Sequence, residues 1–219
     1  MGKINAAKDR HGIGNHAVDH SFIAVVDEEP GFVNLGGNYD YLSRAYYISQ
    51  DYENDGKPIK PTCKEMLDAY VPPLFLEKAK KAGLPVPEYY LSNSYFDPPV
   101  IVDPVNPFTL KGRTVLKAGH VKTIAKSLTR NFTYAVCCQQ IPPGGRVVYF
   151  NSILGWAIQA KYREASRRIW ECFSIPLARV RLIWTESGEY LFSDISPLFP
   201  EDLRERERHH IEENVSWEN

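Results

Sequence analysis

Residues 149–197 read YFNSILGWAIQAKYREASRRIWECFSIPLARVRLIWTESGEYLFSDISP, and they predict a helix followed by a hairpin. Pro176 ends the helix because proline lacks an N–H and disfavours helical geometry in the residue before it. Arg179 and Arg181 then alternate with apolar residues, which is the period of a strand with one polar face. A turn at 186–188 leads into a second strand over 190–195. The expected helix face consists of apolar residues at three- and four-residue spacing: Leu154, Ile158, Tyr162, Ala165, Ile169 and Phe173.

The rest of the chain alternates short apolar runs with amphipathic stretches. Strands are expected at 22–26, 32–35, 100–102 and 133–139, and helices at 39–54, 64–82 and 118–129. Asn38 or Asp40 is expected to cap the first helix. Thr62 and Glu65 form a capping-box pattern at the start of the second, which Pro72-Pro73 must kink or split. Residues 147–149 either lead into the helix described above or form a strand just before it. The fold class is α+β (or α/β), with helices packed on a central mixed sheet of short strands.

The expected domain organisation follows from composition along the chain. Residues 1–20 are polar and weakly periodic, and predict a flexible N-terminal arm. Residues 21–200 predict a single α/β domain whose middle, 85–107, is rich in proline. Residues 201–219 are dense in charge and predict a charged C-terminal tail or helix.

The overall charge and hydropathy exclude some classes of function. The formal net charge is −1, so the chain as a whole gives no electrostatic case for nucleic acid. No apolar run is long enough to span a bilayer, and the N-terminus does not resemble a signal peptide. We therefore expect a cytoplasmic protein without a membrane or nucleic-acid partner. The four cysteines do not have metal-ligand spacing, and adjacent Cys137 and Cys138 would point to opposite faces of a strand.

Candidate binding residues are mostly basic, and no residue pattern identifies a nucleophile or a catalytic acid. The basic stretch around Lys111, Arg113 and Lys117 either faces a phosphate or carboxylate ligand or is a solvated surface. Arg146 and Arg181 are added to this candidate anion site. Separately, Gly36-Gly37 between a strand and a helix would suit either a phosphate or a tight turn.

Two histidines in the N-terminal arm give a candidate metal site. His16 and His20 are four residues apart and would share one face of a helix, which suits zinc or nickel coordination. A solvated arm that docks on a partner subunit is the alternative.

Two pieces of the chain resemble a known domain. Residues 33–61 carry Tyr46-Tyr47-Ile48-Ser49 after a strand and before a Gly-x-Pro return. Residues 149–197 carry Tyr149-Phe150, a Phe-x-x-Pro-Leu-x-Arg segment over 173–179, and Ile195-Ser196-Pro197. Both resemble the two ends of the domain found N-terminal to RimK-like ATP-grasp ligases.

A rival placement resembles the ATP-grasp domain itself. Residues 65–90, EMLDAYVPPLFLEKAKKAGLPVPEYY, are similar to the entry of that domain. The final hairpin would then be its metal-binding end, where magnesium requires an acid in the first strand and Glu-x-Asn in the second. This chain has Arg181 and Asp194-Ile195-Ser196 there, and the usual nucleotide lysine falls at Asp103. The resemblance therefore implies a degenerate ATP-grasp domain.

Both placements imply association with ATP-grasp ligases. The expected function is a non-catalytic accessory or substrate-presenting subunit of a RimK-like amino-acid (glutamate) ligase system, with C1-carrier cofactor biosynthesis as one such pathway. The expected partner is a separate ATP-grasp ligase chain or a second copy, and ATP with magnesium would act only through that ligase. The alternative is a stand-alone ATP-dependent carboxylate–amine ligase, or another enzyme that binds an anionic substrate through its basic middle segment.

Overall fold

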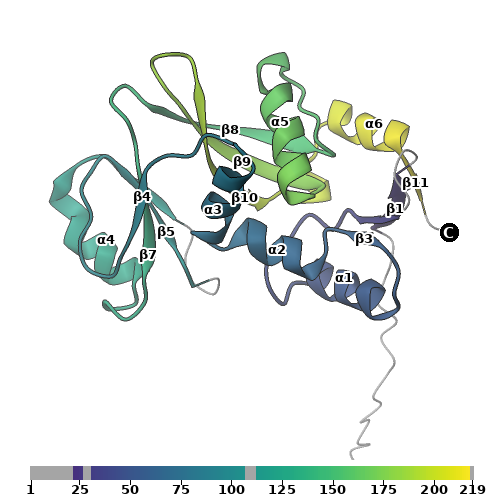
Figure 1. The fold of residues 1–219 in the computed structure, drawn as a ribbon, viewed down its shortest axis with the longest axis horizontal. Helices are drawn as coiled ribbons and strands as arrows, with labels where there is room; N and C mark the ends of the chain where they lie inside the picture. Colours follow the sequence, from purple (N-terminus) through teal and green to yellow (C-terminus); the bar gives the residue numbers. More distant parts are fainter. Residues whose placement is uncertain (1–21, 27–30, 107–111, 218–219) are drawn as a thin grey trace, which may run out of the picture.

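The computed structural model describes residues 22–26, 31–106 and 112–217, and the strands of this part form three sheets (Figure 1). His16, His20 and Lys111 lie outside the described residues. The mixed α+β class is confirmed, with the strands divided among three sheets in place of one central sheet. Among the described residues, no helix combines the length and the apolar character needed to cross a membrane.

Each sheet is named here by its place in the chain. The N-terminal sheet has the order β11 (Val215–Trp217), β1 (Ile23–Val26), β2 (Phe32–Asn34), β3 (Ile59–Lys60). The middle sheet has the order β4 (Tyr89–Ser92), β7 (Val136–Gln140), β5 (Val100–Pro104), β6 (Arg113–Val115). The hairpin sheet has the order β10 (Tyr190–Pro197), β9 (Leu177–Trp184), β8 (Arg146–Ile153). Described strand pairs are antiparallel except β2 with β3.

The helices are α1 (Arg44–Asn54), α2 (Cys63–Tyr70), α3 (Leu74–Lys81), α4 (Val121–Leu128), α5 (Ala160–Phe173) and α6 (Glu205–Asn214). The capping box at α2 is confirmed: the Glu65 N–H donates to Thr62 Oγ1 at 3.2 Å, and the Thr62 N–H donates to Glu65 Oε2 at 2.8 Å. The split at the two prolines is also confirmed, since α2 ends at Tyr70 and α3 begins at Leu74. The expected cap of α1 is wrong, because Ser43 caps this helix in place of Asn38 or Asp40.

The helix of the 149–197 stretch starts later than the apolar spacing predicts. β8 runs to Ile153, so the strand-before-helix alternative is the right one. Leu154 and Gly155 then turn the chain with φ of 49° and 78°. Ile153 and Trp156 close that turn by exchanging backbone hydrogen bonds of 2.8 Å. Leu154 and Ile158 therefore precede α5 and are not part of its buried face. That face consists of the later residues of the predicted apolar face together with Ser166: Tyr162, Ala165, Ser166, Ile169 and Phe173.

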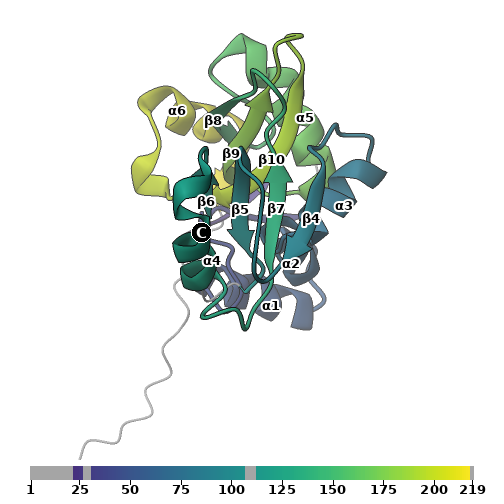
Figure 2. The same ribbon diagram turned by 90° about the vertical axis from the view of Figure 1, so that its left-hand side faces the viewer.

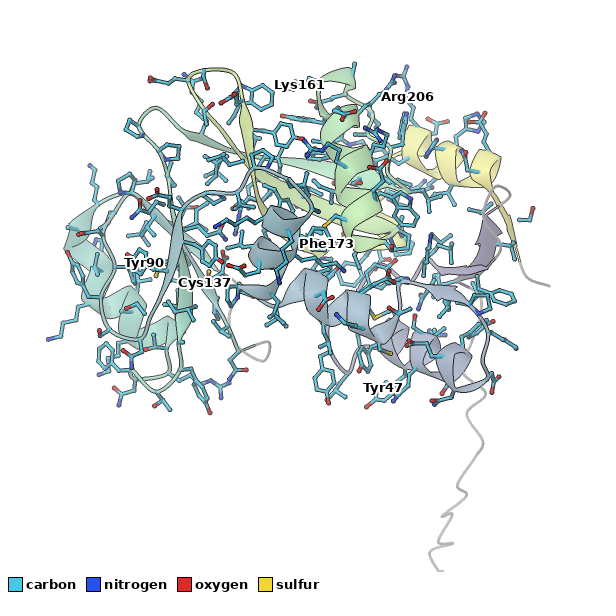
Figure 3. All side chains as sticks on the ribbon, in the orientation of Figure 1. Tyr47, Tyr90, Cys137, Lys161, Phe173 and Arg206 are labelled. Atoms are coloured by element: carbon cyan, nitrogen blue, oxygen red, sulfur yellow. The ribbon has the colours of Figure 1, made fainter. Side chains whose placement is uncertain are left out.

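The main core lies on one face of the hairpin sheet, under α5, α2 and α3. Phe150 of β8 stacks on Tyr162 of α5 with ring centroids 4.6 Å apart. Phe192 of β10 lies between Phe173 and Phe75, at 5.4 Å and 6.0 Å from their rings. Figure 3 shows Phe173 in the interior beside α3. These contacts fix α5 on the sheet and leave the opposite face of β9 free to carry polar side chains.

The charged C-terminal segment folds back onto the start of the chain. After α6, β11 pairs antiparallel with β1, with Val215 opposite Val26. The two ends of the described chain therefore share one sheet. Glu207 of α6 is buried, which ties this helix to the body of the protein beside β8.

Candidate functional site

The middle sheet packs face to face against the side of the hairpin sheet that α5 does not cover (Figure 2). Side chains alternate along a strand, so Ile101 and Asp103 lie on one face of β5, and Arg181 and Ile183 on one face of β9. Ile101 and Ile183 are buried together with Ile141. The charged residue of each strand therefore meets its counterpart just beyond this apolar contact.

Arg181 and Asp103 form a buried, bidentate ion pair between the two sheets. Arg181 Nη2 lies 2.6 Å from Asp103 Oδ2, and Nη1 lies 3.2 Å from Oδ1. Only 6% of the Arg181 side chain and 10% of the Asp103 side chain are exposed. Charge-assisted pairs of this geometry are among the strongest hydrogen-bonded contacts in proteins. The pair joins positions 78 residues apart in the sequence.

Two buried polar residues complete what is here called the inter-sheet network: Asp103, Gln139, Arg181 and Ser193. Gln139 Nε2 donates to Asp103 Oδ2 at 2.8 Å and to the Ser193 carbonyl at 2.9 Å. Arg181 Nε donates to Ser193 Oγ at 2.9 Å, and that hydroxyl donates to Gln139 Oε1 at 2.8 Å. The β9–β10 register shifts between Phe192 and Asp194, which places Ser193 at this irregularity. Each member therefore has a partner inside the protein.

Asp194 lies at the edge of the network. Its Oδ2 is 3.9 Å from Arg181 Nη1, and 21% of its side chain is exposed. Enclosure by the protein is the main reason that the pKa of Asp194 is raised to about 7. The nearby Arg181 guanidinium lowers this pKa, and the Asp103 carboxylate raises it further. Burial lowers the pKa of Arg181, but the Asp194 and Asp103 carboxylates raise it above its ordinary value overall. The guanidinium is therefore charged at any pH at which the protein is folded.

The residues around the network do not fit magnesium and ATP. Magnesium is held by oxygen ligands, chiefly carboxylates and phosphates. The position that the ATP-grasp resemblance assigns to an acid holds Arg181, and the position that it assigns to a lysine holds Asp103. Within the described ranges, no group of three or more His, Cys, Asp or Glu is placed to hold a metal ion. The acidic and basic positions expected for a nucleotide site are thus exchanged in this chain, and the two residues that occupy them neutralise each other.

The structure places the predicted anion-binding residues on separate elements. Arg113 is exposed on β6, Lys117 is exposed just before α4, and Arg146 is exposed at the start of β8. Arg181 lies apart from these three residues, because it is buried and already paired with Asp103. The sequence signal for Arg181 was its alternation in the strand, which gives its face but not its partner.

The Gly36-Gly37 loop is accounted for by a tight turn. Gly37 has φ of 76°, and a Cβ added there would lie 2.3 Å from the Leu198 carbonyl oxygen. The Leu198 N–H donates to the Gly37 carbonyl at 3.1 Å. A side chain at position 37 would therefore push this loop away from the chain that follows β10.

A pocket of about 370 Å³ opens beside β8, on the side of α6 and the start of α5. This β8–α6 pocket includes Arg179, whose guanidinium lies over the Tyr149 ring at 5.2 Å from its centroid. Arg204, at the start of α6, also lines it, and neither arginine forms an ion pair with a described residue. Glu207 is occupied by the Arg204 N–H at 2.8 Å and by Asn151 Nδ2 at 3.3 Å. The pocket thus presents two guanidinium groups beside the satisfied carboxylate of Glu207 and the exposed carboxylate of Asp202.

Sequence reasoning did not find this pocket. The alternation of β9 places Arg179 on the same face as Arg181, so the sequence indicated the position of one of the two pocket arginines on its strand. Arg204 is more than 20 residues further along the chain in a segment expected as a charged tail or helix, and only the packing of α6 against β8 brings it close.

Three solved structures show what the fold resembles. A RimK domain ATP-grasp protein from Sphaerobacter thermophilus matches 81% of this chain and 74% of its own, with a TM-score of 0.56 and 15% identity. D-alanine–D-alanine ligase from Helicobacter pylori gives 0.53 and 14%, over 75% of this chain and 64% of its own. An ADP complex of N5-carboxyaminoimidazole ribonucleotide synthetase gives 0.51 and 12%, over 74% and 53%.

The chain has an ATP-grasp-like fold. This agrees with the rival placement, in which the chain corresponds to an ATP-grasp domain, whereas the placement as an N-terminal domain is not confirmed. No protein-family model matches the sequence, and no curated protein matches it either. At these identities the likeness concerns the fold and not the activity.

Proposed function

We propose that this chain is a non-catalytic, substrate-presenting subunit that works beside a separate ATP-grasp ligase chain. The observation that carries the proposal is the Arg181–Asp103 ion pair between the middle and hairpin sheets. It occupies the two positions that the resemblance assigns to a metal-binding acid and a nucleotide-binding lysine. Cofactor biosynthesis as the pathway remains a prediction, since no described residue bears on it.

The energetics of the pair support a fixed, closed contact between these sheets. Breaking a buried ion pair leaves uncompensated charges in a low-dielectric interior, at a cost of about 3–5 kcal/mol when one partner is removed. A nucleotide entering between the sheets would have to separate Arg181 from Asp103 and also strip Gln139 and Ser193 of their partners. The attraction between a triphosphate and the freed Arg181 guanidinium would then be opposed by repulsion from the Asp103 carboxylate.

The β8–α6 pocket supports a role in holding a substrate. Its volume of about 370 Å³ is in the range of small-molecule sites. Guanidinium groups match the planar geometry of carboxylates and bind them through two parallel hydrogen bonds. Arg179 and Arg204 therefore fit a carboxylate-bearing molecule or the carboxyl end of a peptide, which is the kind of group that a carboxylate–amine ligase activates.

The proposal is tested with the full chain and a separate RimK-like ligase from the same organism. ATP consumption and ligation of L-glutamate are measured for the ligase alone, for this chain alone and for both together. We expect no ADP from this chain alone and a faster ligation when both are present. ADP production by the chain alone, or a ligation rate that its addition does not change, contradicts the proposal.

A matched pair of variants tests the pocket within the same assay. Arg179→Gln removes a guanidinium from the pocket, and Arg206→Gln removes one that points to solvent from α6 (Figure 3). We expect the first variant to lose the stimulation and the second to keep it. Equal loss in both variants would mean that overall charge, and not the pocket, is responsible.

A further inference from the structure

The middle sheet and α4 form a basic lobe within a chain that is nearly neutral overall. Residues 89–140 contain six Lys and Arg against two acids, Asp97 and Asp103, whereas the whole chain contains 26 against 27. Asp103 is buried in its pair with Arg181, so it contributes nothing to the outer surface of this lobe. The net charge of −1 therefore conceals a local positive surface, with the excess of acids elsewhere in the chain.

The cations of this lobe lie along the outer side of α4. Val121, Ala125 and Leu128 are buried against the middle sheet, so the exposed Lys122 and Lys126 face solvent. Figure 1 shows α4 on the side of the middle sheet away from α5. Lys122 and Lys126 are about 6 Å apart along the helix axis. Arg113 and Lys117 extend the charge toward β6. None of these four cations (Arg113, Lys117, Lys122 and Lys126) forms an ion pair with a described residue.

The turn that follows α4 exposes two aromatic side chains at the C-terminal end of the helix that carries Lys122 and Lys126. Arg130, Asn131 and Phe132 have φ of 47°, 60° and 65°, a run of left-handed residues that costs about 1–3 kcal/mol at each position. Thr129 supports the turn: its hydroxyl donates to the Ala125 carbonyl and accepts from the Phe132 N–H, both at 2.7 Å. Phe132 and Tyr134 remain 36% and 42% exposed.

We infer that this surface binds single-stranded nucleic acid, with the α4 cations on the phosphates and Phe132 and Tyr134 stacked on bases. Lysine is depleted at protein–protein interfaces, whereas a line of Lys and Arg beside exposed rings is the arrangement that holds single strands. The lobe is small and the remainder of the chain is acidic, so the bound segment is short. The inference revises the expectation drawn from net charge alone, and it does not rest on the proposed ligase role.

The test is fluorescence anisotropy with fluorescein-labelled 15-nucleotide oligo(dT) and oligo(U), using the full chain over a range of salt concentrations. Four phosphate contacts predict that the logarithm of the association constant falls with the logarithm of salt with a slope of about −3. K122E/K126E is expected to weaken binding at least tenfold. K80E/K81E makes the same charge change on exposed positions of α3 and is expected to leave affinity within twofold.

The stacking contribution is tested separately with F132L/Y134L, which removes the rings but keeps apolar side chains. We expect at least a tenfold loss of affinity with an unchanged salt slope. Circular dichroism melting checks that each variant is folded. The inference is overturned if the wild-type chain binds neither oligonucleotide, or if K80E/K81E weakens binding as much as K122E/K126E does. It is also overturned if poly-L-aspartate binds more tightly than oligo(dT) at the same salt, which would identify an acidic polypeptide as the partner.

Discussion

Replacing Arg181 by Met tests whether the inter-sheet network holds the two sheets together. The substitution keeps a long apolar side chain but leaves the Asp103 carboxylate buried, with Gln139 as its remaining side-chain donor among the described residues. Removing one partner of a buried pair destabilises a protein by about 3–5 kcal/mol. A chain of this length shifts by about 2–4 °C per kcal/mol, so the melting temperature should fall by roughly 6–20 °C.

The assay is equilibrium unfolding in urea, followed by circular dichroism and by tryptophan fluorescence. The double variant D103L/R181M removes both charges, while Gln139 and Ser193 keep the bond between them. We expect it to recover most of the lost stability, because buried pairs replaced by apolar residues are often neutral in cost. The reasoning is refuted if R181M unfolds within 0.5 kcal/mol (about the scatter of surface substitutions) of the wild type.

Three further predictions concern other parts of the fold. Because folding raises the pKa of Asp194, the folded state binds its proton more tightly than the unfolded chain does. The stability that this carboxyl contributes is therefore fully present below its unfolded pKa and is lost as the pH rises to about 7. Asp194→Asn should lose that pH dependence in urea unfolding, and an unchanged slope would contradict the assignment. Thr62→Ala should lower the free energy of unfolding by about 1 kcal/mol through loss of the α2 cap, and Thr62→Ser should retain it. Ile101→Ala should cost about 2–5 kcal/mol because Ile101 is fully buried between the sheets; a cost below 1 kcal/mol would contradict that packing.

Local sequence signals predicted the elements whose ends are set by their own residues. The two prolines and the Thr62–Glu65 box fixed the boundaries of α2 and α3, because capping and proline geometry act within one turn of helix. The alternation of polar and apolar residues predicted β9, and the turn at 186–188 predicted the return strand β10, but not the irregularity at Ser193. The start of α5 was missed because Leu154 fits a helical spacing while its backbone turns left-handed before the helix begins.

The periodicity of the sequence did not predict which residues meet across long distances in the chain. Arg181 and Asp103 were singled out as residues that reverse the charges of an ATP-grasp site, but nothing in the sequence showed that they meet. The adjacent cysteines were expected on opposite faces, and Cys137 indeed packs in the main core while Cys138 packs toward α4. Alternation therefore assigned faces correctly, whereas the pairing of sheets requires the folded chain.

The most direct test of the central claim is a calorimetric titration of the full wild-type chain with Mg–ATP. The Arg181–Asp103 pair replaces the charges that would hold the nucleotide, so the account predicts only the heat of dilution up to millimolar ATP. A saturable heat with a 1:1 stoichiometry would contradict it, because it would show that this ATP-grasp-like fold binds the nucleotide by itself.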